Sequence, residues 1–574
     1  MEKVKEFCKQ KKYEIIWVAL ILVITGFMFF WIGQKDGFHE DEIFSYGSSN
    51  YKWDSVFQAV GKSDYINATI EKYVITDDLG KTLQNIAHYV THPDEFNQLA
   101  NELRSEEKLV WKTKEEAKDY VTIGEGDVWN YLSVYYHQAR DVHPPLFYAV
   151  VHLVSSIAYG TFSKYIIFAI NLVFILLTCN SIRKIFQLWN KKWLGLLAVA
   201  LYGFSMGAAT TAIFLRMYAM LTFFTVEYLY FNLKLLKNNF TMTKKDKWKL
   251  FFIVLLGFLT QYYFCLFAIF VFIMMCIYGF KKKAYKQIKS YILTHIITAI
   301  VGVVLFPPSI YHIFLSYRGA GAGDSGKGLI EVIWFYIQRL QEGFSIQNLT
   351  MYGIVLLVTV GCIAKLIGKI KNKQIKNMQS YLLIAIPTIL YFIIVAKLAP
   401  TNVGEKPAIR YIMNILPMFA ILFVLAISCL FKERKITYLI TTVIVVAMSI
   451  NGMIFNKPTY LYEGYDQYTQ IAQKYSHLPF IYTADNSFTP INSIPEFLIY
   501  DKTLIIDMSY NKNLTFLKED EVLQNTSQFV LSIKKWTNVE EILFTILENT
   551  GFTTYELLYN EPDETQSVIY LISR

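Results

Sequence analysis

The chain contains long apolar runs without charged residues, and these runs constrain its fold more than any other feature. The first, residues 15–33 (IIWVALILVITGFMFFWIG), follows the lysine-rich start MEKVKEFCKQKK. About 20 apolar residues cross a hydrocarbon core about 30 Å thick as one helix. Because no small-residue cleavage site follows this run and many further runs do, we predict an uncleaved first membrane helix rather than a signal peptide.

Ten further runs follow, so the sequence predicts about 11 membrane spans. The two runs within residues 249–280 must turn near Gln261 and Tyr262. The ten predicted spans are residues 163–182, 193–213, 216–236, 249–264, 265–280, 290–311, 350–369, 380–398, 409–430 and 436–456.

The basic connectors set the predicted orientation. Spans that alternate in direction place every dense basic connector on one side, as the positive-inside rule requires. These connectors are residues 183–192, 237–249, 281–289, 365–376 and 432–435. The sequence therefore predicts a multi-pass protein of the cell (plasma) membrane with a cytoplasmic N-terminus. The apolar residues 144–160 would invert every later connector if they spanned, so we predict a helix in the outer membrane face there.

The composition agrees with a membrane protein and disfavours other classes. Hydrophobic residues make up 54% of the 574 residues and charged residues only 18%, and the mean hydropathy is +0.32. Soluble chains carry about 25% charged residues, so a disordered chain and an ordinary cytosolic enzyme are both disfavoured. The net charge of +9 does not indicate a nucleic-acid partner. The basic residues cluster between apolar runs, which is typical of a protein face beside the lipid bilayer.

Three regions are then predicted to face outward: residues 34–142, 312–349 and 457–574. The last alternates the strand-like runs PFIYTAD, TLIIDM, QFVLSI and SVIYLI with the helix-like NVEEILFTILENTGF, which predicts a small α/β domain. The glycine-rich YRGAGAGDSGKG in the second region predicts a mobile segment. The predicted fold class is therefore mainly α: a polytopic helix bundle over residues 1–456, followed by an extracytoplasmic α/β domain over 457–574.

Four ionisable residues stand directly after the first predicted span, at the outer membrane surface: His39, Glu40, Asp41 and Glu42. One interpretation is a solvated end of the loop. The other is a carboxylate site at the end of a rigid helix, where apolar surroundings and like charges raise the pKa of a carboxyl toward the range of a general base. The residues alone leave both interpretations open.

The far end of the same loop carries Asp141 and His143 in ARDVHPPLFYAV, directly before the predicted interfacial helix. Pro144 and Pro145 make a stiff entry to that helix, because each proline fixes φ. Asp141 or His143 either caps the helix or belongs to a functional site, and the sequence leaves the two alternatives open.

Basic residues are rare in the predicted outward connectors, so those that occur there are candidates for a functional site. They are Arg216 in FLRMYAM, Arg318 in SYRGAGAG, and Lys406 and Arg410 in GEKPAIRYIMNILP. Snorkelling to lipid head groups is the alternative for each of them. Carboxylates and cations together fit a lipid phosphate substrate. Sugar transfer from a polyprenyl phosphate needs cations for the leaving phosphate and one carboxylate to deprotonate the acceptor.

These motifs resemble the GT-C superfamily of multispanning glycosyltransferases that use lipid-phosphate sugars, especially the bacterial branch related to protein O-mannosyltransferases and aminoarabinose transferases. Its members have an acidic motif after the first helix, a HPPLYY-like motif after a long loop, an aRMY-like motif, and an RY motif opening a late helix. The counterparts here are Asp41-Glu42, HPPLFYAV, LRMYAM and Arg410-Tyr411.

The resemblance implies catalytic roles for three acidic residues. Asp41 would be the general base toward the acceptor, with Glu42 shaping the site. Asp141 would be the second acidic position, supported by His143. The acidic run reads HEDE, so Glu40 competes with Asp41 for the role of base.

The resemblance also implies a donor site and a reaction. Arg410, with Tyr411, would bind the donor phosphate, and Arg216 and Lys406 are further candidates for binding substrate. The reaction would be an inverting transfer of one sugar from a polyprenyl phosphate to a glycan, lipid or protein of the cell envelope, as in bacterial protein glycosylation.

The sequence leaves open whether the protein binds a metal ion. A monophosphate donor requires no cofactor, and no tight ligand spacing such as HExxH occurs. The oligosaccharyltransferase branch of the family does use a metal, so Mg or Mn stays an alternative. Five of the nine histidines lie in the long loop: His39, His88, His92, His137 and His143.

Two other classes of function remain. A transporter or flippase of lipid-linked glycans would show inverted repeats and midplane charges, and the sequence shows neither. A non-catalytic membrane scaffold would leave the acidic and basic motifs without a purpose.

Overall fold

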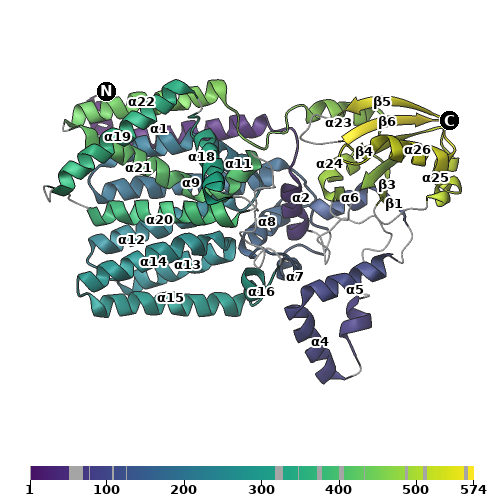
Figure 1. Cartoon of the computed structure of the whole chain (residues 1–574), viewed down its shortest axis with the longest axis horizontal. Helices are drawn as coiled ribbons and strands as arrows, with labels where there is room; N and C mark the ends of the chain where they lie inside the picture. The colour runs from purple at the N-terminus through teal and green to yellow at the C-terminus, as the bar shows by residue number, and fades with distance from the viewer. Residues whose placement is uncertain are drawn as a thin grey trace. The chain divides into compact units, whose positions relative to one another are not determined.

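The structure is a computed structural model that is mainly helical (Figure 1). It describes residues 2–50, 69–76, 78–105, 109–124, 126–316, 328–346, 348–371, 378–399, 406–431, 433–484, 489–508, 514–560 and 567–574. The helices before residue 240 are α1 (Glu2–Gly33), α2 (Glu40–Asn50), the π-helical turn η1 (Ile70–Val74), α4 (Leu79–Thr91), α5 (Pro93–Ser105), α6 (Lys114–Val121), α7 (Tyr131–Arg140), α8 (Leu146–Ile157), α9 (Lys164–Leu188), α10 (Lys192–Gly203), α11 (Met206–Ile213) and α12 (Tyr218–Lys237).

The helices after residue 240 follow in chain order, and those labelled η are short 3-10 helices. They are α13 (Lys244–Thr260), α14 (Tyr263–Lys281), α15 (Tyr285–Leu305), α16 (Ser309–Phe314), α18 (Leu329–Gly343), α19 (Leu349–Lys371), α20 (Met378–Leu398), η2 (Lys406–Tyr411), η3 (Met413–Ile415), α21 (Leu416–Leu430), α22 (Arg434–Phe455), α23 (Tyr465–Lys474), η4 (Thr489–Ser493), α24 (Ile494–Phe497), η5 (Thr515–Lys518), α25 (Glu521–Gln524) and α26 (Val539–Thr550).

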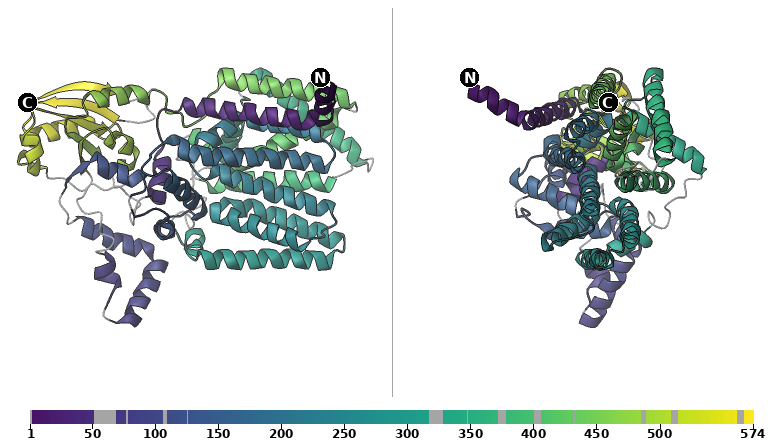
Figure 2. Two further views of the ribbon diagram at one scale, coloured as in Figure 1. Left: turned by 180° about the vertical axis from the view of Figure 1, so that it is seen from behind. Right: turned by 90° about the vertical axis from the view of Figure 1, so that its left-hand side faces the viewer.

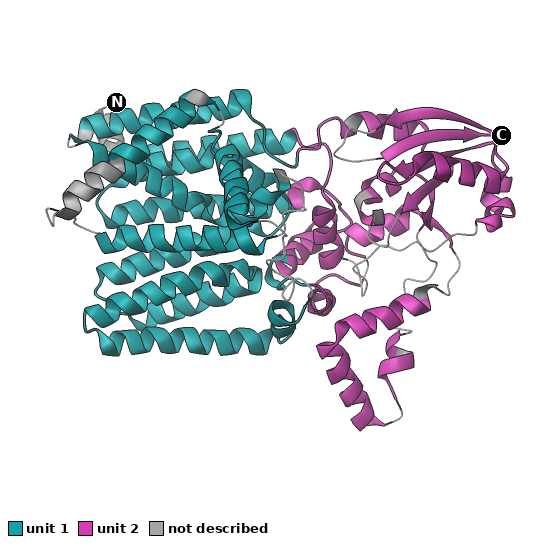
Figure 3. Cartoon of the chain, in the orientation of Figure 1, with its two compact units in different colours: residues 1–33, 142–147, 167–460 teal, residues 34–141, 148–166, 461–574 magenta. Residues whose placement is uncertain are grey.

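The chain forms two compact units (Figure 3). Unit 1 holds residues 1–33, 142–147 and 167–460. Unit 2 holds residues 34–141, 148–166 and 461–574. The predicted division at 456/457 stays a prediction about domains.

Long helices of unit 1 run side by side, as Figures 1 and 2 show for α12, α13, α14 and α15. Helix α13 packs on α12 and α15, and α14 packs on α20. Among the described helices, seven are long and apolar enough to cross a membrane: Lys11–Gly33, Lys164–Leu188, Tyr263–Lys281, Tyr285–Leu305, Met378–Leu398, Met413–Leu430 and Lys435–Phe455. Helices α10 and α11, bent by 61° at their junction, make an eighth if they are one span. The protein is therefore a multi-pass membrane protein.

The described helices that meet this measure account for seven or eight of the about 11 predicted spans, and three predicted spans do not meet it. Helix α12 carries Glu227, Lys234 and Lys237. Helix α13 has 17 residues and starts with the charged run KKDKWK. The apolar part of α19 among the described residues is only Thr350–Gly361.

Two local predictions are confirmed. Helix α13 ends at Thr260 and α14 begins at Tyr263, so the chain turns at the predicted residues, Gln261 and Tyr262. Helix α8 has 12 residues, about 18 Å at 1.5 Å per residue, so it is too short to cross a bilayer, as predicted. Its place in the outer membrane face stays a prediction.

Unit 2 contains a six-stranded sheet of order β1-β3-β2-β4-β6-β5. Its strands are β1 (Trp111–Thr113), β2 (Phe480–Ala484), β3 (Lys502–Asp507), β4 (Gln528–Lys534), β5 (Thr554–Asn560) and β6 (Ser567–Ser573). Strands β2, β3 and β4 are parallel, whereas β6 pairs antiparallel with β4 and β5. Strand β1, from the first long loop, pairs antiparallel with β3, with Trp111 opposite Leu504.

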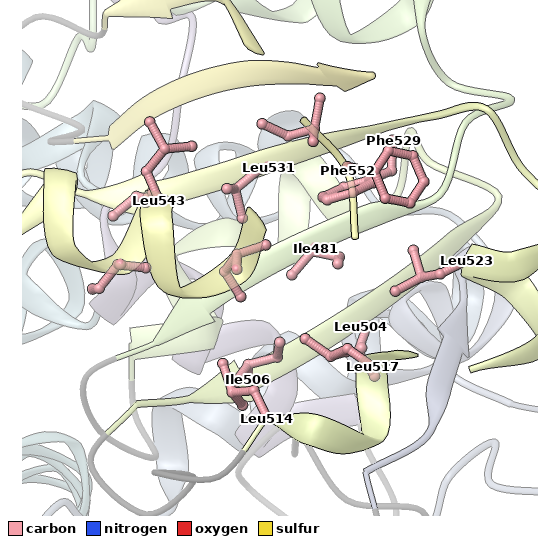
Figure 4. Close-up of a cluster of buried hydrophobic side chains, with 14 residues drawn as sticks. Ile481, Leu504, Ile506, Leu514, Leu517, Leu523, Phe529, Leu531, Leu543 and Phe552 are labelled. Carbon is pink, nitrogen blue, oxygen red and sulfur yellow. The ribbon is translucent and has the colours of Figure 1, made fainter. Parts of the chain in front are cut away.

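Apolar side chains on one face of this sheet form the core of the C-terminal region (Figure 4). Ile481, Leu504 and Phe529 come from three neighbouring strands, and Leu543 and Ile546 of α26 pack against them. The C-terminal α/β structure is thus confirmed. Strands β1 and β5 were not predicted.

Glycines allow a close crossing of two helices in unit 1. A Cβ on Gly207 of α11 would lie 2.5 Å from Cδ1 of Leu416 and 3.3 Å from Cα of Gly343, at the end of α18. Gly343 in turn lies against Ile409, where an added Cβ would be 3.4 Å from Cδ1. Because Gly207 and Gly343 have no side chain, α18 can lie close to both α11 and η2.

We expect Gly207→Leu to destabilise unit 1 by about 1–3 kcal/mol or more, because the backbone of Gly343 cannot move as a side chain would. Thermal unfolding in detergent would show a lower Tm. Gly353→Leu in α19 is the matched control, since a Cβ there meets no atom within 4 Å. Equal Tm values for the two variants would contradict the close crossing.

Candidate functional site

Helix α2 begins in the predicted acidic run, with His39 as its N-terminal cap. The backbone N–H of Asp41 donates to Nδ1 of His39 (3.0 Å), and the backbone N–H of His39 donates to the Glu42 carboxylate (2.7 Å). These reciprocal bonds satisfy donors that a helix start leaves without intrahelical partners. The run therefore folds as the first helical turn and not as an irregular loop end.

Glu42 forms a buried ion pair. Nζ of Lys35 lies 3.0 Å from Oε2 of Glu42, and neither side chain has any exposed surface. Lys35 also faces aromatic rings, with Nζ at 5.2 Å from the ring centroid of Tyr462 and 6.0 Å from that of Phe38. Both side chains are removed from water, so each offsets part of the cost of burying the other's charge.

Asp41 has a different environment from its neighbour. Its side chain is 26% exposed, and Oδ2 lies 3.6 Å from Nδ1 of His39, whose side chain is 17% exposed. Glu40 is exposed. Of the three consecutive carboxyls, Asp41 thus combines access for a substrate with a position held by the helix start, whereas Glu42 is enclosed.

The C-terminal half of α2 is fixed by hydrogen bonds from two histidines. His137 of α7 donates from Nδ1–H to the carbonyl oxygen of Ser48 (3.1 Å), and His152 of α8 donates in the same way to Ser49 (2.6 Å). A Cβ on Gly47 would lie 2.3 Å from Cζ of Tyr120, so α6 comes into direct contact with this helix.

His137 is neutral because it is buried. Only 2% of its surface is exposed, and desolvation lowers the pKa of His137 to about 4, with nearby Arg140 acting in the same direction and the bond to Ser48 opposing both. Among the described residues, Nε2 has no hydrogen-bond partner, so a proton there would be buried without an acceptor.

Asp141 and His143 are half-buried and belong to different units, unit 2 and unit 1 respectively. The backbone N–H of Asp141 donates to the carbonyl oxygen of His137 (3.0 Å), which ends α7. Helix α8 begins only at Leu146, after Pro145. Asp141 is therefore the C-terminal cap of the preceding helix, and its predicted role as an acidic site residue stays a prediction.

The predicted cations Arg216 and Arg410 are both buried in unit 1, with 4% and 9% of their surface exposed. Arg216 lies in the turn between α11 and α12, where its backbone N–H donates to the carbonyl oxygen of Phe214 (2.7 Å). Arg410 lies in η2 and donates from Nη2 to the hydroxyl of Tyr411 (3.4 Å). Burial at these depths is not what snorkelling to lipid head groups produces.

A tyrosine-rich wall surrounds the Arg410-Tyr411 pair. The hydroxyl of Tyr391 donates to the carbonyl oxygen of Tyr411 (3.1 Å), and the ring of Tyr263 lies edge-on to that of Tyr411 with centroids 5.8 Å apart. Tyr460 connects η2 to the Arg216 turn. Its hydroxyl donates to the carbonyl oxygen of Pro407 (3.0 Å), and its ring stacks on Phe214 at 3.9 Å.

The structure thus divides the predicted site residues between its units. Asp41, Glu42 and Asp141 are in unit 2, and the histidine and cations are in unit 1. Lys406 is the first residue of η2, and nothing is described of its side chain. Arg318 and the glycine-rich segment around it lie outside the described residues.

No group of three or more His, Cys, Asp or Glu side chains placed to hold a metal ion occurs in the described part of the chain. Most of the histidines of the long loop have other partners, such as the stacked His88 and His92 with ring centroids 4.5 Å apart and the bond from His88 to Glu95 (2.7 Å). The metal that the sequence leaves open therefore stays an open prediction, and we derive no step through a metal.

Sequence reasoning missed Lys35, the partner of Glu42, although a lysine seven residues before a carboxylate was visible in QKDGFHEDE. It also missed the role of His137, because the bond to Ser48 joins residues 89 positions apart. No local pattern signals a contact of that kind.

No protein-family profile matches the chain. No curated protein matches it either. Among solved structures, ArnT from Cupriavidus metallidurans in the apo state matches at a TM-score of 0.44 and 12% identity, over 97% of this chain and 98% of that chain. The archaeal oligosaccharyltransferase AglB from Archaeoglobus fulgidus, in complex with an inhibitory peptide and a dolichol-phosphate, matches at 0.35 and 11%, over 71% of this chain and 63% of that chain. Likenesses at these scores carry no conclusion about the substrate or reaction of this chain.

Removing one partner of the buried Lys35–Glu42 pair should lower the free energy of unfolding by about 3–5 kcal/mol, because the other charge stays buried without compensation. We expect a large loss of Tm for Lys35→Met and for Glu42→Gln, and a smaller loss for the double variant than the sum of the two. Lys114→Met is the matched control. Its pair with Asp501 is similarly short, at 2.8 Å, but both side chains are about half exposed, so Tm should hardly change. Additive losses would refute the coupling.

The burial of neutral His137 should make the free energy of unfolding fall in acid. Its pKa is about 4 in the folded protein and about 6.5 in the unfolded chain, so between these values the unfolded state binds more protons. Stability should therefore fall as the pH drops from about 6.5 to 4, by up to about 3 kcal/mol. His137→Asn keeps a donor for Ser48 and removes the titration. Its Tm should depend less on pH over this range, and an unchanged slope would exclude His137 as the cause.

Proposed function

We propose that the protein is an integral membrane glycosyltransferase that moves a sugar from a polyprenyl-phosphate donor to a glycan, lipid or protein acceptor of the cell envelope. The reaction is placed at the extracytoplasmic face, with the N-terminus cytoplasmic and residues 457–574 outside. The positive-inside pattern supports this orientation. The GT-C-like motifs and the multi-pass helical fold support the reaction class.

The observation that carries the proposal is the contrast between two adjacent carboxyls. Glu42 is enclosed and neutralised by Lys35 at 3.0 Å, whereas Asp41, next to it on the same helical turn, is 26% exposed. A general base must reach the proton that it removes and must be held in place. Asp41 meets both conditions, and the Lys35–Glu42 pair holds the turn that carries it.

In the proposed step, a carboxylate oxygen of Asp41 takes the proton of an acceptor hydroxyl as its oxygen attacks C1 of the donor sugar. The bond between C1 and the phosphate oxygen breaks, and its electron pair stays on the phosphate. The products are the glycosylated acceptor, with inverted configuration at C1, and a polyprenyl phosphate with one more negative charge. Attack from the side opposite the leaving group accounts for the inversion.

The leaving phosphate needs cations in a place of low dielectric. Arg410 serves this role in the proposal, because it is 9% exposed and lies beside Tyr411 in a tyrosine-rich surrounding. Arg216 and Lys406 are secondary candidates for the same charge. Asp141 and His143 are assigned only to shaping the acceptor side.

The test is sugar transfer by the purified protein from a panel of polyprenyl-phosphate sugars. Asp41→Asn keeps the size of the side chain and removes the base, so we expect a loss of about a hundredfold or more in the rate of transfer. Donor binding should persist, because the variant retains Arg410.

Glu40→Gln is the matched control, since Glu40 is exposed on the same helical turn and should leave the rate nearly unchanged. If Glu40→Gln abolishes transfer and Asp41→Asn does not, Glu40 is the base. If the wild-type protein neither binds nor turns over any donor, the glycosyltransferase proposal is wrong, and a transporter or a scaffold becomes the better hypothesis.

A further inference from the structure

Helix α18 carries an arginine on its buried face. The buried residues of this helix are Val332, Tyr336, Arg339 and Gly343, spaced four, three and four residues apart, which is one stripe along a helix. The side chain of Arg339 is only 5% exposed. A charged group at a position that the pattern reserves for apolar residues is costly unless it has a purpose.

The internal partners of Arg339 leave part of its guanidinium unused. Nη2 lies 3.0 Å from Oε1 of Glu342, a carboxylate that is 28% exposed, and the guanidinium carbon lies 5.1 Å from the ring centroid of Phe335. Among the residues that the structure describes, Nε and Nη1 of Arg339 have no hydrogen-bond acceptor, although both are buried. Buried donors without an acceptor point to a ligand that supplies one.

Arg410 belongs to the same surroundings. Helix α18 packs on η2, and Gly343 of α18 lies against Ile409 of η2. Gly343 is one turn beyond Arg339 on the same stripe, and Ile409 directly precedes Arg410. Both arginines also act on Tyr336. Burial is the main cause that raises the pKa of Tyr336, Tyr411 adds to the rise, and the positive charges of Arg410 and Arg339 both oppose it.

The surroundings of these two arginines are aromatic and dry. Tyr336 is completely buried and Tyr411 is 8% exposed, with Tyr263 and Tyr391 against Tyr411. In such a medium, electrostatic attraction between a guanidinium and an anion is stronger than in water. Glu342 offsets part of the charge of Arg339 but occupies only the Nη2 end.

We propose that Arg339 and Arg410 together form a binding site for a phosphate monoester dianion, the phosphate of the lipid that leaves in the transfer reaction. The inference deepens the proposed function and rests on it. The sugar donor is a phosphodiester with one negative charge. When the bond between C1 and the phosphate oxygen breaks, the electron pair stays on the phosphate, and the product is a monoester that carries about two charges at neutral pH.

A second guanidinium therefore matches charge that appears only as the bond breaks. Interactions that are stronger with the departing phosphate than with the intact donor lower the barrier, whereas those equal for both do not. The same arrangement implies that the lipid phosphate product binds more tightly than the donor, so it inhibits the enzyme until it dissociates.

Binding without turnover tests this assignment. The probes are farnesyl phosphate, a monoester, its methyl diester and inorganic phosphate, each titrated at neutral pH into the full-length protein in detergent. We expect the wild type to bind the monoester at least about tenfold more tightly than the diester. Arg339→Gln should reduce this preference to nearly one and weaken binding of the diester much less.

Two further variants make the result specific. Arg339→Lys keeps the charge and loses the planar fork, so it should retain part of the preference. Arg183→Gln is the matched control. Arg183 also pairs with one carboxylate, Glu14 (2.9 Å), and lies over the rings of Trp17 (4.5 Å) and Tyr13 (6.0 Å). Its removal should leave the preference intact. Tm values of all variants identify any that fail to fold.

The outcomes are distinct. Equal preference in wild type and in a folded Arg339→Gln variant overturns the assignment, even if sugar transfer is intact and the proposed function stands. Inorganic phosphate that binds as tightly as farnesyl phosphate overturns the lipid as the source of the phosphate. A monoester preference that depends on Arg339, in a protein that transfers no sugar, supports the anion site and contradicts the glycosyltransferase.

Discussion

The buried ion pair between Lys35 and Glu42 is the interaction on which the organisation of the acidic segment depends. Two charges without exposed surface offset each other's cost of burial when they are paired, so the pair stabilises the start of α2 in this position. The same carboxylate also accepts the N–H of His39 and so completes the helix start. A neighbouring carboxyl, Asp41, can then remain accessible without making the turn flexible. Glu42 is thus used for structure, and in the proposed function Asp41 beside it is the general base.

The sequence predicts this structure where the signal is local. Apolar runs located most of the long helices, the interruption at Gln261 and Tyr262 marked a real turn, and alternating apolar runs marked strands β2, β3, β4 and β6. Three of the predicted spans do not meet the measure of length and composition, and α12, for example, holds Glu227 and two lysines within its apolar run. Prediction by hydropathy counts residues and does not test whether a helix has enough uncharged length.

Non-local contacts account for what the sequence did not predict. His137 and β1 act through partners far away in the sequence, and a strand of three residues such as Trp111–Thr113 has no periodicity to detect. Arg339 is an intermediate case. The buried stripe of α18 can be predicted from its spacing, and a cation on that stripe is visible in the sequence, but its relation to Arg410 requires the packing of α18 on η2.

The distance in sequence between β1 and its partner strand constrains when the sheet can form during synthesis. Strand β1 pairs with β3, and the indole N–H of Trp111 donates to the carboxylate of Asp520 (2.9 Å), a residue 409 positions later. During synthesis, the segment with β1 leaves the ribosome long before its partners exist, and nearly all the membrane helices are made in the interval. Unit 2 therefore cannot complete its sheet until the end of translation, and a chain that stops before residue 500 leaves β1 without β3.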